Sequence, residues 1–138
     1  MAITWSETYA TGINSVDDQH KELFKAVDRL LAACNEGKGK EEVGKIMDFL
    51  GEYVIIHFGH EEDLQKKHAY PGYQTHKKLH DEFIAGFGDL KNRFEQEGPS
   101  LSMVTSINRT VVDWLIKHIG QVDKEMGRYL KLYSKPGI

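Results

Sequence analysis

The sequence predicts an all-α protein, an up-down-up-down four-helix bundle with an extended N-terminal arm. Its three prolines, Pro71, Pro99 and Pro136, together with glycines at 37–39, divide the chain into segments of helical length. Within these segments apolar residues recur every three or four positions, and no strand-like alternation competes with that pattern. Because short connections join long amphipathic helices, neighbouring helices are expected to run antiparallel.

Residues 1 to about 15 are expected to form the arm, with Trp5 anchoring it against the bundle. The first helix is predicted to follow the N-cap candidates Asp17 and Asp18 and to end near Gly37. Its apolar face consists of Leu23, Phe24, Val27, Leu30, Leu31 and Cys34. Cys34 is the single cysteine, so the chain can form no internal disulfide.

Three more helices are predicted in the rest of the chain. The second runs from about Lys40 to Lys67, the third starts just after Gly72, and the fourth begins near Ser100. Their inner faces carry Val43, Ile46, Met47, Leu50, Val54 and Leu64, then Leu79, Phe83, Phe87, Leu90 and Phe94, then Val104, Ile107, Val111, Trp114, Leu115, Val122, Met126 and Leu130. We therefore expect a single domain spanning residues 1–138.

The charge balance and hydropathy argue against several classes of protein. The net charge of −3 comes from 21 acidic and 18 basic residues, which leaves no basic excess for a nucleic-acid partner. The longest purely apolar run, residues 53–56, is far shorter than the roughly 20 residues of a membrane helix. The first ten residues lack the pattern of a signal peptide. We expect a cytoplasmic monomer that does not insert into membranes.

Ionisable residues interrupt the predicted apolar faces where leucine would be cheaper to bury. They are His20, His57, Glu61, His76, His80, His118 and Asp123. Burying such groups without partners costs on the order of several kcal/mol each, so the set needs a shared partner such as a metal. In an up-down-up-down bundle all seven fall within roughly three turns of the same end. They are therefore expected to converge on one metal site.

A count of coordination positions favours two irons over other metals. Two six-coordinate irons offer twelve positions, of which five histidines, two bridging carboxylates and one oxo or hydroxo bridge fill eleven. The open position is what two-electron binding of O2 requires. A tetrahedral zinc would leave three of the seven residues without a role. Ferritin-like sites need a glutamate three residues before a histidine, and no such pair occurs.

Four segments resemble the hemerythrins, specifically the bacterial ones: DDQH at 17–20, HFGHEE at 57–62, YPGYQTHKKLH at 70–80 and WLIKHIGQVD at 114–123. The resemblance covers essentially the whole chain and implies a di-iron centre that binds O2 reversibly. It implies that one iron is held by His76, His80 and His118, that the other, with the vacant position, is held by His20 and His57, and that Glu61 and Asp123 bridge both. O2 would be stored, carried or delivered to an intracellular oxygenase or a respiratory enzyme.

Other functions stay open alongside this one. The same centre could act as an enzyme on O2, peroxide or nitric oxide, although no base, nucleophile or substrate-orienting arginine is conspicuous nearby, so we expect a protein that is not an enzyme. An O2-sensing module is the third possibility. Sensors normally carry an output domain, for which the chain has no residues left over.

Several residues near the predicted ligands receive separate expectations. Gln65 stands where the resembled family often has methionine, and Met126 stands where tyrosine is common. His60, His68 and Glu62 fall off the ligand-bearing face and are expected to be solvent-exposed. The residues one turn from ligands are expected to form a dry apolar wall: Phe24, Val54, Phe83, Leu115 and Ile119.

The fourth helix carries a geometric conflict. His118 and Asp123 are five residues apart and would point about 140° away from each other on a regular helix. A single i→i+5 turn would remove the conflict, and Gly120 lowers the cost of irregular backbone there. A regular helix with a local bend is the alternative.

Overall fold

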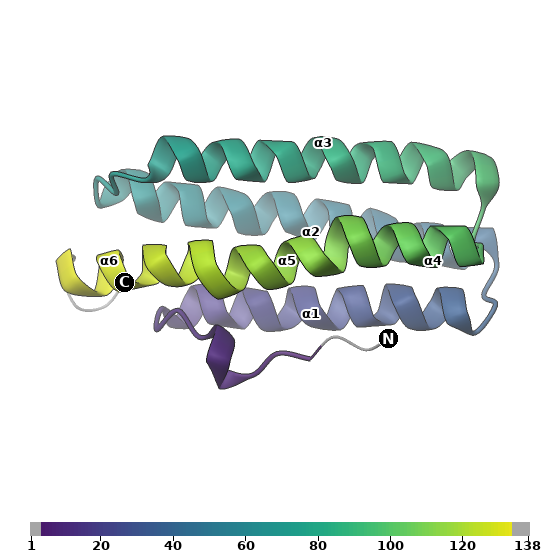
Figure 1. Cartoon of the computed structure of the whole chain (residues 1–138), viewed down its shortest axis with the longest axis horizontal. Helices are drawn as coiled ribbons and strands as arrows, with labels where there is room; N and C mark the ends of the chain where they lie inside the picture. The colour runs from purple at the N-terminus through teal and green to yellow at the C-terminus, as the bar shows by residue number, and fades with distance from the viewer. Residues whose placement is uncertain (1–3, 134–138) are drawn as a thin grey trace.

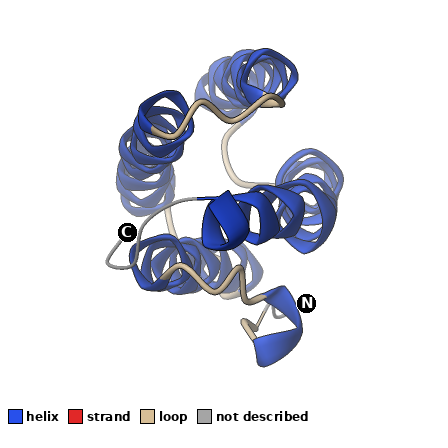
Figure 2. Ribbon diagram, turned by 90° about the vertical axis from the view of Figure 1, so that its left-hand side faces the viewer, coloured by secondary structure: helices blue, strands red, loops and turns tan. Residues whose placement is uncertain are grey.

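The computed structural model describes residues 4–133, and within that range it contains helices and no strand. Four long helical stretches lie side by side and antiparallel (Figures 1 and 2). The first three are α1 (Asn14–Asn35), α2 (Lys40–Lys67) and α3 (Tyr73–Glu97). The fourth is continuous but mixed, and consists of α4 (Leu101–Ile107), η2 (Asn108–Val112), α5 (Asp113–Lys117), η3 (His118–Asp123) and α6 (Lys124–Tyr133). The predicted all-α four-helix bundle is confirmed.

Most helix boundaries follow the local signals in the sequence. α3 ends at Glu97, and Gly98 directly after it has a φ of +73°, a conformation that glycine adopts without steric cost. Pro99 follows, and the Ser100 side chain then caps α4 by accepting a hydrogen bond from the Met103 amide at 3.1 Å. The predicted starts of the second, third and fourth helices are therefore confirmed.

The predicted start of the first helix is wrong. α1 begins at Asn14, and Asp17 lies inside the helix instead of capping it. The Asp17 carboxylate accepts hydrogen bonds from the Thr11 amide and the Thr11 hydroxyl, both at 2.8 Å, and from the Gly12 amide at 3.2 Å. These three hydrogen bonds to the Asp17 carboxylate therefore hold the arm onto α1.

The N-terminal arm runs alongside α1 (Figure 1), and its short turn near Tyr9 contacts η3 of the fourth helical stretch. Trp5 packs partly buried against the core, as predicted, with Lys21 Nζ 4.6 Å from the centre of its ring. The arm contains a short 3-10 turn, η1 (Glu7–Tyr9), and Tyr9 makes an edge-on contact with Phe24 at 5.3 Å between ring centroids. These contacts place Tyr9 of the arm over the junction of α1 and η3.

The bundle has one long core and a smaller cluster at the arm end. The long core runs through all four helical stretches, and the smaller cluster contains Ile13, Val16, Met126 and Leu130. Between residues 4 and 133 no helix combines the length and apolar character needed to cross a membrane.

Candidate metal centre

Seven buried ionisable side chains converge near the end of the bundle that faces the viewer in Figure 2. α1 contributes His20, α2 contributes His57 and Glu61, α3 contributes His76 and His80, and η3 contributes His118 and Asp123. These are the seven residues singled out from the sequence. Their expected convergence is observed.

The seven side chains form two overlapping groups. His76, His80 and His118 form a three-histidine group, and His20 and His57 form a two-histidine group. Glu61 and Asp123 belong to both groups, and in each group the candidate ligand atoms all lie within 4.8 Å of one another. The two carboxylates therefore lie between two sets of imidazoles.

Glu61 divides its two oxygens between these groups. Its Oε2 lies 3.0 Å from His57 Nε2 and 3.2 Å from His20 Nε2. Its Oε1 lies 3.2 Å from His80 Nε2 and 3.4 Å from His76 Nε2. One carboxylate thus presents one oxygen to each set of imidazoles.

Asp123 makes the same division from the opposite helix. Its Oδ2 lies 2.9 Å from His20 Nε2, while its Oδ1 lies 2.9 Å from His76 Nε2 and 3.2 Å from His118 Nε2. The arrangement is the one that two cations sharing two carboxylates would need.

A π-helical turn brings Asp123 to this position. η3 spans His118–Asp123, so the predicted i→i+5 turn is confirmed and the regular-helix alternative is wrong. The wider turn places residues five apart on the same side of the helix. Gly120 lies inside it without a positive φ, and a Cβ there would lie 3.8 Å from the Tyr9 ring, an ordinary contact. The glycine is therefore compatible with the turn but not required by it.

The buried carboxylates remain ionised without a metal. Burial raises the pKa of Glu61, but the charge of His57 and hydrogen bonds from neighbouring imidazoles outweigh it and hold the pKa well below its usual range. Burial and the charge of Glu61 raise the pKa of Asp123. The contacts with His118 and His20 have the larger effect, so the pKa of Asp123 lies below its usual range.

Protonated imidazoles balance these charges. Burial lowers the pKa of His20, but the carboxylates of Asp123 and Glu61, whose oxygens lie 2.9 and 3.2 Å from His20 Nε2, prevail and raise it to about 10. Burial also lowers the pKa of His76, but the nearby carboxylates of Asp123 and Glu61 outweigh it and raise the pKa to about 9. Burial lowers the pKa of His57. The raised pKa values of His20 and His76 favour protonated imidazoles beside the two carboxylates, and a bound cation would compete with these protons.

Side chains outside the seven orient two of the imidazoles. His57 Nδ1 donates to Gln19 Oε1 at 2.7 Å, and His80 Nδ1 donates to Glu62 Oε2 at 2.9 Å. A hydrogen on Nδ1 leaves the Nε2 lone pair free to bind a cation in the centre. The expectation that Glu62 is solvent-exposed is wrong, because its side chain is partly buried on His80.

The donor set fits iron. Glu61 Oε1, His80 Nε2 and both Asp123 oxygens are buried and make no hydrogen bond within residues 4–133, so a cation among them would satisfy atoms that are otherwise unpaired. Imidazole nitrogen and carboxylate oxygen are the donors that non-haem iron sites use.

Comparison with known proteins agrees with this geometry. A family model described as the hemerythrin HHE cation binding domain matches residues 11–130. The chain belongs to the hemerythrin family. A bacteriohemerythrin of Methylococcus capsulatus is 35% identical over 126 residues, which cover 91% of this chain and 94% of that protein. The myohemerythrin of Sipunculus nudus is 27% identical, with 86% of each chain covered.

Solved hemerythrin structures share the fold. A crystal structure of a wild-type hemerythrin superposes with a TM-score of 0.82 and 34% sequence identity, covering 93% of this chain and 97% of that one. The residues that the family model matches, 11–130, include all seven residues of the centre.

Aromatic and aliphatic side chains enclose the centre of this hemerythrin. The predicted wall is confirmed as buried: Phe24, Val54, Phe83, Leu115 and Ile119. Two aromatic contacts were not predicted. Phe58 stacks on His80, with 3.8 Å between ring centroids, and Trp114 stacks on His118 at 4.3 Å. These rings hold the imidazole planes of His80 and His118 in place.

The two remaining histidines lie outside the hemerythrin centre. His60 is half-buried, and its Nε2 lies 2.9 Å from Ser15 Oγ. His68 is also half-buried and caps the C-terminal end of α2. Neither belongs to a candidate metal group. The expectation that they are not ligands agrees with this, whereas the expectation that they are solvent-exposed is wrong.

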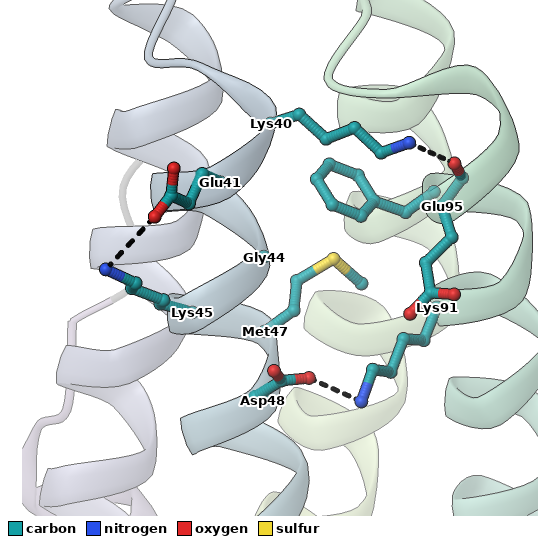
Figure 3. Close-up of a pocket in the computed structure, with 9 residues that line it drawn as sticks. Lys40, Glu41, Gly44, Lys45, Met47, Asp48, Lys91 and Glu95 are labelled. Atoms are coloured by element: carbon teal, nitrogen blue, oxygen red, sulfur yellow. Dashed lines mark hydrogen bonds and ion pairs between the residues drawn. The ribbon is translucent and has the colours of Figure 1, made fainter.

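A groove of about 660 Å³ lies between α2 and α3, toward the opposite end of the bundle (Figure 3). Lys91 pairs with Asp48, Lys45 with Glu41, and Lys40 donates to the Glu95 carbonyl. Each of these three lysine ammonium groups has an oxygen partner, so none of the three is free to bind a ligand in the groove by its charge alone. The chemistry of this hemerythrin therefore centres on the buried histidines and carboxylates.

Proposed function

We propose that the chain holds two iron ions at this centre and binds O2 reversibly for storage, transport or delivery. The observation that supports this most strongly is the division of the Glu61 and Asp123 oxygens between the two histidine groups. The ligands would be His76, His80 and His118 for one iron, His20 and His57 for the other, and Glu61 and Asp123 for both.

The two histidine groups are unequal, and this inequality would create the site for O2. The two-histidine group supplies one imidazole fewer than the three-histidine group, so the open position would lie on the side of His20 and His57. When bound, the iron pair supplies two electrons that O2 takes up and returns. Gln19 would keep the His57 Nε2 lone pair directed into the centre through its 2.7 Å contact with His57 Nδ1.

The surroundings favour holding O2 over consuming it. Phe24, Leu115 and Ile119 are buried and apolar, and they would exclude water and protons from the O2 site. On this proposal residues 1–138 form a single domain that is not an enzyme and acts as a cytoplasmic monomer. An intracellular oxygenase or a respiratory enzyme would receive the O2.

The test combines iron analysis with visible spectroscopy. We expect two irons per chain, and an absorption band that appears when the reduced protein meets air and disappears under vacuum through repeated cycles. One zinc per chain, or a band that air produces and vacuum does not remove, would contradict reversible O2 binding.

A further inference from the structure

A second hollow lies in the seam between α2 and α3 and continues the groove of Figure 3 toward the metal centre. The groove and the hollow share Met47 and the ion pair of Asp48 with Lys91. Along α2 the groove is lined by residues 40–48 and the hollow by residues 47–55. The hollow has a volume of about 390 Å³, several times the roughly 30 Å³ that one water molecule takes up in the liquid. It therefore occupies the stretch of the seam between the groove and the ligands of α2.

The end of this hollow that faces the centre is apolar. Ile55 and Ile84 line its mouth, where they are 57% and 36% exposed. Val54 and Phe83 form its floor and are 2% and 3% exposed. Glu52, the remaining charged residue of the lining, is exposed to solvent. Such a lining admits an apolar gas more readily than water, because water would lose hydrogen bonds inside it.

The floor of the hollow adjoins two histidines of the centre. Val54 precedes His57 by three residues on α2, so it lies about one helical turn away on the side where the open position is proposed. Phe83 follows His80 by three residues on α3. Phe83 also makes an edge-on contact with Phe58 at 5.8 Å between ring centroids, and Phe58 stacks on His80. Two side chains therefore separate the hollow from the surroundings of the ligands.

A separate hollow of about 300 Å³ lies between α3 and the fourth helical stretch and has a different character. Its lining includes Arg93 and Arg109 and none of the apolar residues that form the wall around the centre. The groove of Figure 3 reaches none of these wall residues either. Of these three openings within residues 4–133, the hollow at Val54 and Phe83 is the one that meets the wall.

We propose that O2 enters and leaves the centre through the seam between α2 and α3, by way of this hollow and past Val54 and Phe83. These two side chains close the floor in this structure, so they must move aside briefly by changing rotamer. The inference rests on the proposed function, because it takes O2 as the molecule that travels. It gives Val54 and Phe83 control over the rate of O2 exchange, in addition to their exclusion of water.

The first test measures the rate constants of O2 binding and release by the reduced, iron-loaded protein in a stopped-flow instrument. Gly88 lines the hollow, and a Cβ there would meet nothing within 4 Å. Helical side chains lean toward the preceding turn, so the new side chain of Gly88→Leu should lie toward Ile84 and fill the hollow. Both rate constants should fall by about three- to tenfold and by the same factor, since O2 passes the obstruction in both directions, and the equilibrium affinity should not change. Ala85→Leu, at an exposed alanine of α3 outside the lining, is the matched control.

Xenon tests the hollow without iron or O2, because it binds in apolar cavities of proteins. Under xenon pressure, methyl NMR of the metal-free protein should show shifts at Val54 and Ile84. Gly88→Leu should reduce these shifts, and Ala85→Leu should not. Parent-like rate constants in Gly88→Leu, a change in the release rate alone, or the absence of a xenon shift at Val54 would overturn the inference. Failure of the parent protein to bind O2 would instead overturn the proposed function, and with it the assignment of O2 to this route.

Discussion

Loss of Glu61 or Asp123 should disturb the centre more than loss of any single histidine. Each histidine belongs to one group, whereas Glu61 and Asp123 direct one oxygen to each group. Glu61 is fully buried, and its Oε1 has no hydrogen bond. Its removal would therefore affect both candidate metal positions together.

Glu61→Ala should abolish binding of both irons, because each metal loses an oxygen ligand and the link between them. His57→Ala should leave the three-histidine group able to retain one iron. Iron content after exhaustive dialysis distinguishes the two outcomes, with Glu82→Ala, at an exposed glutamate of α3, as the control. Retention of two irons and reversible oxygenation by Glu61→Ala would show that Glu61 does not bridge.

The seven residues of the centre could be predicted because each places an ionisable group on an apolar helix face. Gln19 and Glu62 could not be found this way. Each is adjacent in sequence to a predicted ligand, and an offset of one residue rotates a side chain by about 100° around its helix. That rotation directs Gln19 and Glu62 to imidazoles on neighbouring helices. Only the packing of the helices reveals these contacts.

Helix starts could be predicted from the sequence where neighbouring residues mark them, and could not where a residue's partner lies in another segment. Glycine and proline marked the starts of α2, α3 and α4, but the start of α1 was missed because Asp17 bonds to the arm. The π-turn of η3 followed from the spacing of two site residues. The π-turn of η2, at Asn108–Val112, was not predicted. No two predicted site residues lie there at a spacing that a regular helix would point in different directions.

The arm depends on a glycine in α6. A Cβ added at Gly127 would lie 2.5 Å from the Thr11 carbonyl oxygen, so the arm would have to shift. We expect Gly127→Ala to lower the free energy of unfolding by about 1–3 kcal/mol, the usual cost of overpacking. Gly88→Ala in α3 is the control, since its Cβ would meet nothing within 4 Å and should stabilise the helix by up to about 1 kcal/mol. Equal denaturation midpoints for the two variants would contradict this account of the arm.

At the level of the whole molecule, the bundle stabilises a cluster of charges that would be costly to bury singly. The pKa values of Glu61 and Asp123 lie below their usual range, and those of His20 and His76 lie above it, so neighbouring carboxylates and imidazoles stabilise one another's charged forms. Metal binding would replace these protons with cations, so the stabilities of the apo-protein and the metal-bound protein should respond differently to pH.

The apo-protein should lose stability as the pH rises from about 6.5 to 10. The pKa values of His20 and His76 are raised to about 10 and about 9 in the folded chain and return toward 6.5 on unfolding. Their contribution is therefore complete below pH 6.5 and is lost as the pH passes through 9 and 10. Urea unfolding of apo-protein and iron-loaded protein at pH 6.5, 8 and 9.5 should show a difference that widens with pH. A constant difference would contradict this charge balance.

The bridging of two irons by Glu61 and Asp123 is the central claim, and magnetic measurements on the air-oxidised, iron-loaded protein test it most directly. Two ferric ions that share bridging ligands should be antiferromagnetically coupled, so the sample should contain two irons per chain and give no EPR signal at low temperature. An intense signal of isolated high-spin ferric ions, accounting for all the bound iron, would show that the irons are not bridged and would contradict the account.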